Sequence, residues 1–358
     1  MRCAAKEENM IPRRSVIPIF IPHLGCPCRC VFCDQHSIAA THSAARKAPA
    51  PSEVVSAIEE GISRAGSGAE LAFYGGSFTA INKELRTEYL KAAYPFVQKG
   101  MLGGIRISTR PDAVNEAILY ELEVFGVRTI ELGAQSMDDR VLELAKRGHT
   151  AKDTVLASDM IKKRGLSLIL QMMVGLPGEL PGTAMKTARE LAALRPDGVR
   201  IYPVVVIRGT ELEDLWRRGK YSPPTVSEAS EICADLLHFF DSEGIPVIRT
   251  GLNPSEDLEG EVLAGAYHPA FGEICRSLLL LREARALLGG RDGLSGKTVV
   301  FGVGSGKASM FIGQHRKNAE ALKNEFGLKE IKVRELPDPC DGSNSLSKKN
   351  CVEIIDIY

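Results

Sequence analysis

Four cysteines lie within eight residues near the start of the chain: Cys26, Cys28, Cys30 and Cys33. The other five of the nine cysteines are scattered along the sequence. The first twenty residues carry charges where a signal peptide needs an apolar run, so an extracellular disulfide framework is not expected. Thiolates crowded into so short a segment bind metals or exchange electrons. The sequence therefore predicts metal or redox chemistry at this cluster.

The spacing Cys26-x-x-x-Cys30-x-x-Cys33 begins soon after an apolar run, VIPIFIP, that has the length and β-branched content of a strand. The cysteines should occupy the loop at the strand's carboxyl end, where barrels and open α/β sheets build their sites. Three thiolates in one loop can hold three irons of a 4Fe-4S cluster, which leaves the fourth iron open to another ligand. An iron–sulfur cluster is our first reading of this loop.

Zinc is the alternative metal for the same loop. A zinc site normally has four ligands, and three nearby side chains could supply the fourth: His23, Cys28 and His36. The spacing also permits other sets of three cysteines that include Cys28. We interpret Cys28 as a spectator and the iron–sulfur cluster as the occupant.

The elements that would position this loop follow a regular alternation. Six short apolar runs between Ser15 and about Pro203 are expected to form strands: VIPIFIP, ELAFYG, GIRIST, RTIELGA, LSLILQMMVG and GVRIYPVVV. The longer stretches between them have helical spacing, and Asp112 stands where a helix N-cap is expected. Repeated strand–helix units predict a mainly parallel sheet, because parallel neighbours need a long crossover. The fold class is therefore α/β, as an open sheet or a barrel.

Two motifs in this frame resemble those of radical S-adenosylmethionine (SAM) enzymes. One is the cysteine loop itself, with Phe32 as the aromatic residue before the last cysteine. The other is Tyr74-Gly75-Gly76-Ser77-Phe78-Thr79 after the second strand, which resembles the glycine-rich motif of that family. Glycines permit close backbone approach, and exposed amides and a hydroxyl can meet a carboxylate or an amine.

This resemblance implies a fold, two cofactors and a first set of site residues. The fold is a partial (βα)6 TIM-like barrel of the radical SAM type. The first cofactor is a 4Fe-4S cluster with three ligands: Cys26, Cys30 and Cys33. The second is S-adenosylmethionine, for which the cofactor-binding residues on this side would be Phe32, Gly75, Gly76, Ser77 and Thr79.

Five further motif regions resemble the radical domain of the elongator catalytic subunit. In chain order they are STRPD at 108–112, ELGAQS at 131–136, RGHT at 147–150, GLPG at 175–178, and RIYP with VIRGT at 200–210. The resemblance covers about residues 15 to 222. Nothing after Gly209 resembles the acetyltransferase-like domain of that subunit, so the chain looks like a short bacterial-type relative that lacks it. Carboxymethylation-type chemistry at a wobble uridine therefore does not follow from the resemblance.

The resemblance implies roles for five more residues, and His268 is added as a hypothesis from its place in a loop. The catalytic candidates, expected to face ribose or substrate, are Arg110, Glu131, Gln135 and His268, the last of these in a loop, YHPAF, that could close over the barrel mouth. Met173 and Gly175 would line the adenine side of the cofactor. Arg110 could instead pair with a neighbouring carboxylate, and Met173 could be a core residue.

The predicted organisation has five segments: an N-terminal tail 1–14, a radical SAM core barrel 15–225, a helical extension 226–290, a small βααβ unit 291–336 and a flexible tail 337–358. The βααβ order is that of a KH-like core. Gly313-Gln314-His315-Arg316 stands where the KH GxxG loop clamps a nucleic-acid backbone, although Arg316 replaces the second glycine. A small αβ appendage with a solvated basic turn is the simpler alternative.

The charge balance limits how the chain could attract a polyanion. Lys and Arg number 45, as do Asp and Glu, so the formal net charge is zero and RNA would have to meet a local basic cluster. One segment combines basic and aromatic residues suited to stacking on unpaired bases: Trp216, Arg217, Arg218, Lys220 and Tyr221. No stretch approaches about 18 uninterrupted apolar residues, so we expect no membrane span and a cytoplasmic protein.

The predicted function is that of a radical SAM enzyme. It would cleave S-adenosylmethionine reductively to a 5′-deoxyadenosyl radical and modify tRNA, with tRNA or another RNA and an electron donor such as flavodoxin or ferredoxin as partners. One alternative keeps this chemistry on a small tetrapyrrole-like substrate, as in the related anaerobic coproporphyrinogen oxidases. A second alternative is a non-catalytic RNA-binding or zinc-stabilised module.

Overall fold

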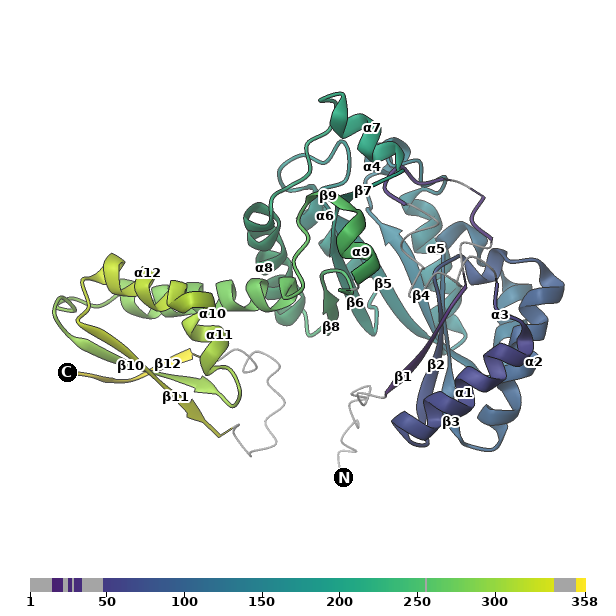
Figure 1. Ribbon diagram of the computed structural model, residues 1–358, viewed down its shortest axis with the longest axis horizontal. Coiled ribbons are helices and arrows are strands. Elements are labelled where there is room, and N and C mark those ends of the chain that lie inside the picture. Colours follow the sequence, from purple (N-terminus) through teal and green to yellow (C-terminus); the bar gives the residue numbers. More distant parts are fainter. Residues whose placement is uncertain (1–14, 22–24, 28, 34–47, 255, 338–351) are drawn as a thin grey trace, which may run out of the picture. The chain divides into compact units, whose positions relative to one another are not determined.

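The computed structural model describes residues 15–21, 25–27, 29–33, 48–254, 256–337 and 352–358 (Figure 1). His23, Cys28 and His36, named above as further zinc ligands, lie outside these residues. The chain divides into two compact units. Unit 1 comprises residues 1–135 and 146–171, and unit 2 comprises residues 136–145 and 172–358.

Unit 1 contains four parallel strands with helices between them. The strands, paired in chain order, are β1 (Val16–Phe20), β2 (Ala69–Tyr74), β3 (Leu102–Thr109) and β4 (Val127–Gln135). The helices are α1 (Pro51–Ala65), η1 (Phe78–Ala80), α2 (Lys83–Gln98), η2 (Pro111–Ala113), α3 (Glu116–Val124) and α5 (Ala151–Lys163). The first four predicted strands are therefore confirmed.

Polar side chains fix where these helices begin. Thr150 accepts a hydrogen bond from the Asp153 amide, and the Asp153 carboxylate accepts one from the Thr150 amide, which is a capping box at the start of α5. The expected N-cap at Asp112 is wrong. Asp112 lies within η2 and its carboxylate accepts a hydrogen bond from Arg110, while the Asn115 side chain caps α3.

The strands of unit 1 have one apolar and one polar face. Tyr89 of α2 stacks on Phe73 of β2 with ring centroids 5.8 Å apart, so the face that contains Phe73 packs against a helix. Side chains alternate along a strand, and the opposite face therefore contains Glu70 of β2 and its polar neighbours Arg106 and Glu131 on β3 and β4. This polar face is buried as well.

A seven-stranded sheet has the order β1-β2-β3-β4-β5-β6-β8. Its strands are parallel and follow one another in chain order, which confirms the α/β class and the partial barrel of the radical SAM type. β5 (Ser167–Val174) crosses the boundary between the two units, and β6 (Gly198–Pro203) and β8 (Val247–Thr250) belong to unit 2. The sequence predicts six strands and misses β8, a four-residue strand that follows a long helix.

The rest of unit 2 is mostly helical up to residue 289. Its helices are α4 (Asp139–Leu144), α6 (Thr183–Ala193), α7 (Glu211–Arg217), α8 (Val226–Ser242), α9 (Glu256–Glu261) and α10 (Phe271–Gly289). A small antiparallel sheet joins β7 (Val205–Ile207) to β9 (Val262–Gly265). In the described part of the chain no helix is both long enough and apolar enough to span a membrane.

The C-terminal segment of unit 2 forms a three-stranded sheet of order β11-β10-β12. Its elements are β10 (Thr298–Gly304), α11 (Ala308–Ile312), η3 (Gln314–Arg316), α12 (Lys317–Phe326), β11 (Glu330–Leu336) and β12 (Val352–Ile357). The expected βααβ order is present. The expected flexible tail 337–358 is wrong at its end, because residues 352–357 pair antiparallel with β10, and their half-buried Val352, Ile354 and Ile357 pack against the core of this segment. The other domain boundaries stay predictions.

Candidate functional site

The cysteine loop follows β1, as predicted. Cys30 is buried, Cys26, Phe32 and Cys33 are half-buried, and the Cys33 amide donates to the Cys30 carbonyl oxygen over 3.1 Å to close a turn. Within the described residues, no three His, Cys, Asp or Glu side chains already converge on a metal position. Metal binding and local folding are coupled, so the three thiolates would have to turn toward a common centre on binding.

Two glycines allow the cysteine loop to pack closely against the glycine-rich motif. Gly25 has φ of +81°, and a Cβ there would lie 2.5 Å from the Ser77 carbonyl oxygen. Gly75 has φ of +94°, and a Cβ there would lie 2.9 Å from the Ile21 carbonyl oxygen. The Cys26 thiol donates to Ser77 Oγ over 3.6 Å. The two predicted motifs are therefore in direct contact, and the contact depends on glycine at both positions.

The glycine-rich motif ends in a tightly packed turn. Ser77 and Thr79 are buried, and Thr79 shares a hydrogen bond of 2.6 Å with Thr109 at the end of β3. Phe78 stacks on Phe73 with ring centroids 4.9 Å apart. The turn is thus anchored on both sides, while the Gly76 backbone remains partly accessible.

A buried ion-pair network crosses the strands beneath the motif. Arg106 donates to Glu131 from Nη1 over 2.7 Å and to Glu70 from Nε over 2.8 Å. Thr129 donates to the second Glu70 oxygen over 2.6 Å, and the Tyr74 hydroxyl lies 3.4 Å from the Glu131 carboxylate. Burial opposes the charged form of Arg106, but the two carboxylates outweigh it and raise the pKa of Arg106. Glu131, a predicted catalytic residue, is therefore fixed in position by its contacts with Arg106 and Tyr74.

Arg147 reaches the cysteine loop from the segment after α4. Its Nη1 donates to Cys30 Sγ over 3.2 Å and its Nη2 to the Gly133 carbonyl oxygen over 2.7 Å. Arg110 donates from Nη2 to the Arg147 carbonyl oxygen over 2.5 Å and from Nε to Asp112 over 2.6 Å. The carboxylate partner considered for Arg110 is therefore present, and a role toward ribose or substrate stays a prediction.

Gln135 ends β4 in a left-handed conformation, with φ of 66°. Such a conformation costs a non-glycine residue about 1–3 kcal/mol, and residues held in it cluster at functional sites. The Gln135 side chain is buried and its Oε1 accepts a hydrogen bond from Gln171 Nε2 over 3.2 Å. This strain supports the prediction that Gln135 belongs to the site.

His149, two residues after Arg147, is a buried neutral imidazole. Its Nε2 lies 3.2 Å from the Ala134 carbonyl oxygen. Burial, and then the charge of Arg147, lower the pKa of His149 to about 4. At neutral pH the arginine is therefore the cationic member of the RGHT segment next to the cysteines.

Three predicted site residues belong to unit 2. Met173 is buried at the end of β5. Gly175 has φ of +91°, and a Cβ there would lie 2.6 Å from Pro224 Cδ. The Gly175 amide donates to Glu179 over 2.8 Å, and its carbonyl accepts from the Tyr221 hydroxyl over 2.5 Å. His268 is half-buried, and its Nδ1 accepts from the Ala270 amide just before α10.

The Tyr221 contact changes one expectation from the sequence. Burial and the nearby Glu179 carboxylate raise the pKa of Tyr221, so this side chain belongs to the Gly175 loop rather than to an open stacking surface. Arg217, Arg218 and Lys220 are exposed. Trp216 is half-buried, with the Arg217 guanidinium 5.6 Å from its ring centroid.

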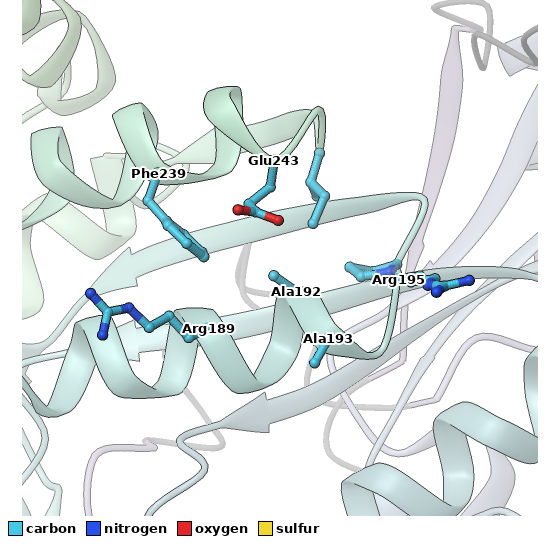
Figure 2. A pocket seen from close by; sticks show the side chains of 8 residues that line it. Arg189, Ala192, Ala193, Arg195, Phe239 and Glu243 are labelled. Atoms are coloured by element: carbon cyan, nitrogen blue, oxygen red, sulfur yellow. The ribbon is translucent and has the colours of Figure 1, made fainter.

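A pocket of about 760 Å³ in unit 2 lies between α6 and α8 and contains none of the predicted site residues (Figure 2). Arg189 and Ala192 of α6 and Phe239 of α8 line it, with Glu243 just after α8 and Ile245. Ile245 precedes β8, so the pocket opens at the amino end of that strand. Parallel α/β folds build their catalytic sites at the carboxyl ends of strands, and we do not assign the chemistry here.

Two arginines of unit 1 have contacts that the sequence does not predict. Arg106 interrupts the apolar run GIRIST, and Glu70 and Glu131 interrupt the two neighbouring runs. Opposite charges in three adjacent predicted strands are the feature of the sequence that could have indicated this ion-pair network. Arg147 was recognised only as part of the RGHT segment. Its contact with Cys30 joins residues 117 positions apart and has no local signal.

Comparisons with known proteins cover most of the described chain. Residues 20–191 match the radical SAM superfamily, and residues 196–279 match the radical SAM C-terminal domain. An uncharacterized protein of Methanocaldococcus jannaschii is 32% identical over 232 residues, which are 62% of this chain and 70% of that protein. The superfamily match covers the cysteine loop and the glycine-rich motif.

One relative whose name states an activity matches over a shorter segment. The tRNA uridine(34) acetyltransferase of Methanocaldococcus jannaschii is 40% identical over 129 residues, which are 35% of this chain and 24% of that protein. The match therefore spans about a quarter of that relative's length. Among solved structures, Elp3 of Methanocaldococcus infernus with an N-terminal deletion aligns with a TM-score of 0.57 at 23% identity, over 74% of this chain and 62% of that one. At this identity the likeness shows the fold alone.

Proposed function

Because this chain belongs to the radical SAM superfamily of enzymes, we propose that it holds a 4Fe-4S cluster on Cys26, Cys30 and Cys33 and uses S-adenosylmethionine to modify tRNA. When bound, the cluster would supply the electron that cleaves S-adenosylmethionine to methionine and a 5′-deoxyadenosyl radical. The observation that carries the proposal is the contact between the cysteine loop and the glycine-rich motif.

The residues around the loop fit an iron–sulfur cluster by their chemistry. Three thiols lie on one short loop, and thiolate sulfur is the ligand that such clusters take. The buried Arg147 guanidinium donates to one of these sulfurs and has an unpartnered Nε, so its positive charge suits an anionic neighbour. Zinc remains the other metal that three thiolates could bind, and the metal content of the protein separates the two.

The remaining roles extend the same proposal. Gly75, Gly76 and Ser77 would hold the methionine end of S-adenosylmethionine through backbone amides and a hydroxyl, next to Phe32 and Thr79. Glu131 would act from a fixed position, because Arg106 and Tyr74 contact its carboxylate. Met173 and Gly175 on the adenine side, and Gln135, Arg110 and His268 toward the substrate, are kept as predictions.

The substrate part of the proposal rests on the relative that is named as a tRNA enzyme. Acetyl transfer is not carried over, because the match covers about a quarter of that protein. The exposed basic residues of this chain are also consistent with an RNA partner: Arg217, Arg218, Lys220, Arg316 and Lys317. A tRNA substrate would place the enzyme in the cytoplasm, with an electron donor such as flavodoxin or ferredoxin.

The test is 5′-deoxyadenosine formation from S-adenosylmethionine by the anaerobically reconstituted and reduced chain, with and without bulk tRNA. Cys30→Ala removes one proposed ligand. Cys233→Ala is the matched control, because Cys233 is a buried cysteine of α8 outside the loop. We expect about four irons per chain and product formation that rises with tRNA in the wild type and in Cys233→Ala. Cys30→Ala should form no product.

Three results would contradict parts of the proposal. A colourless protein that contains zinc would contradict the cluster. Product formation that is indifferent to tRNA would contradict the RNA substrate and direct the search to small molecules, including tetrapyrrole-like ones. A full iron–sulfur complement with no cleavage of S-adenosylmethionine would contradict the enzymatic role and favour a binding module.

A further inference from the structure

The Arg147 side chain carries a buried positive charge next to the cysteine loop. The residue is 9% exposed, and in the described part of the chain no carboxylate pairs with it. Its hydrogen bonds go to the Cys30 sulfur and to the Gly133 carbonyl oxygen, and its Nε has no partner. An isolated buried cation is costly unless an anion lies beside it. Thiolate sulfur is the anion that this loop can provide.

The backbone around Arg147 is shaped to present this side chain. Lys146 has φ of 53° and Gly148 has φ of 72°, so left-handed residues flank the arginine on both sides. The Arg147 carbonyl oxygen accepts a hydrogen bond from Arg110 Nη2 over 2.5 Å, and Asp112 fixes the other side of the Arg110 guanidinium. Such strain persists only where surrounding contacts determine the conformation. The backbone of Arg147 is therefore held in place where its side chain contacts Cys30.

Gly133 on β4 leaves room for this approach. A Cβ at Gly133 would lie 3.3 Å from Arg147 Nη2 and 2.8 Å from Gln135 Nε2. The backbone of Gly133 has no positive φ, so alanine is allowed there by conformation, and the ends of these two flexible side chains would have to shift to admit it. Alanine at this position would displace the ends of Arg147 and Gln135 without changing any charge.

We propose that Arg147 is a positioning residue that raises the reduction potential of an iron–sulfur cluster bound at Cys30. This inference rests on the proposed function, because it presupposes a cluster on the cysteine loop. Reduction adds one electron to the cluster and makes it more negative. A buried cation and an N–H donor to a ligand sulfur both stabilise the reduced form, since the potential depends on net charge and on hydrogen bonds to the sulfurs. Arg147 thus makes the first electron transfer easier.

The experiment measures the cluster rather than turnover. The full chain and four variants are reconstituted anaerobically: Arg147→Met, Arg147→Lys, Gly133→Ala and Arg64→Met. Arg64 lies on α1 with a side chain that is 72% exposed, so its variant controls for loss of an arginine elsewhere. Iron and sulfide per chain are determined, and the reduced cluster is followed by electron paramagnetic resonance in a redox titration without S-adenosylmethionine.

We expect the wild type and Arg64→Met to have the same midpoint potential. At the wild-type midpoint potential, the ratio of reduced to oxidised cluster should be at least tenfold lower in Arg147→Met than in the wild type. For a one-electron reduction this corresponds to a midpoint potential lower by about 59 mV. Arg147→Lys should show a smaller fall, because it keeps the charge and loses the paired N–H donors. Gly133→Ala should shift the potential in the same direction with no change of charge.

Different results contradict different claims. A wild-type chain that binds no iron contradicts the proposed function and this inference with it. A wild type that binds four irons, together with Arg147→Met of equal iron content and unchanged midpoint potential, contradicts this inference alone. If Arg147→Met takes up no iron, Arg147→Gln, which also removes the charge, is measured in its place, and a wild-type midpoint in that variant overturns the role of Arg147.

Discussion

Arg106 on β3 and Glu131 on β4 form a buried ion pair in which Nη1 and Oε1 are 2.7 Å apart. The same guanidinium bonds Glu70 on β2, so one side chain connects the polar faces of three adjacent strands. The Glu131 carboxylate is therefore oriented by the sheet before any ligand binds. A candidate catalytic group held in this way needs little reorganisation to meet a substrate.

Arg106→Met should destabilise the protein strongly. The substitution leaves two buried carboxylates, Glu70 and Glu131, without their common partner, and breaking a buried ion pair from one side costs about 3–5 kcal/mol. Urea unfolding of the apoprotein measures the change in the free energy of unfolding. Arg64→Met removes an exposed arginine that pairs with Glu60 and should cost about 0–1 kcal/mol. Equal stability of the two variants would show that the network contributes nothing.

Gly25→Ala should prevent the cysteine loop from seating on the glycine-rich motif. The new Cβ would meet backbone atoms of Ser77, Ala80 and Ile81 at 2.5–2.6 Å, and φ is +81°. Gly66 is a matched control, with φ of +80° and no atom within 4 Å of an added Cβ. Both variants carry a backbone cost of about 1–2 kcal/mol, but only Gly25→Ala has the clash. Iron bound after reconstitution should fall in Gly25→Ala only, and full iron content in that variant would refute the expectation.

The sequence predicts most of the fold because strand and helix periodicities are local. Runs such as GIRIST and RTIELGA are rich in β-branched residues, and their strands appear where expected. β8 and β12 are missed for different reasons. β8 has four residues with no buried side chain, and β12 follows a polar, breaker-rich segment and becomes a strand only because β10 offers an edge for pairing.

The site is predictable only in part. The cysteine loop and the glycine-rich motif follow neighbouring parallel strands, and their contact through Cys26 and Ser77 follows from that order. The contact of Arg147 with Cys30 depends instead on a left-handed turn and on the absence of a side chain at Gly133. Tertiary approach of this kind leaves no periodic pattern in the sequence.

His149 should make the protein less stable as the pH falls below neutral. Burial, followed by the charge of Arg147, lowers the pKa of His149 to about 4, whereas an unfolded histidine titrates near 6.5. The unfolded state therefore binds an extra proton between about pH 7 and pH 4, and the loss reaches about 3 kcal/mol at the acid end. The difference in free energy of unfolding between wild type and His149→Gln, measured at pH 7, 6 and 5, should shrink as the pH falls. A constant difference would contradict a neutral buried His149.

Glu179 should have the opposite pH dependence. Burial raises the pKa of Glu179 to about 7, against the amides of Gly175 and Leu176, which lower it. The folded state thus keeps a proton that the unfolded state loses above about pH 4.5, so this stabilisation is complete below that value and is lost as the pH rises through 7.

Glu179→Gln keeps an acceptor for the Gly175 amide, 2.8 Å away in the wild type, and cannot ionise. Since the side chain is only partly buried, solvent screening reduces the implied 3 kcal/mol to about 1–2 kcal/mol. At pH 8 the variant should be more stable than the wild type by this amount, and at pH 5 most of this difference should be gone. Urea unfolding at both pH values measures this, and an advantage of the variant that is the same at pH 5 and pH 8 would show that ionisation of Glu179 is not its cause.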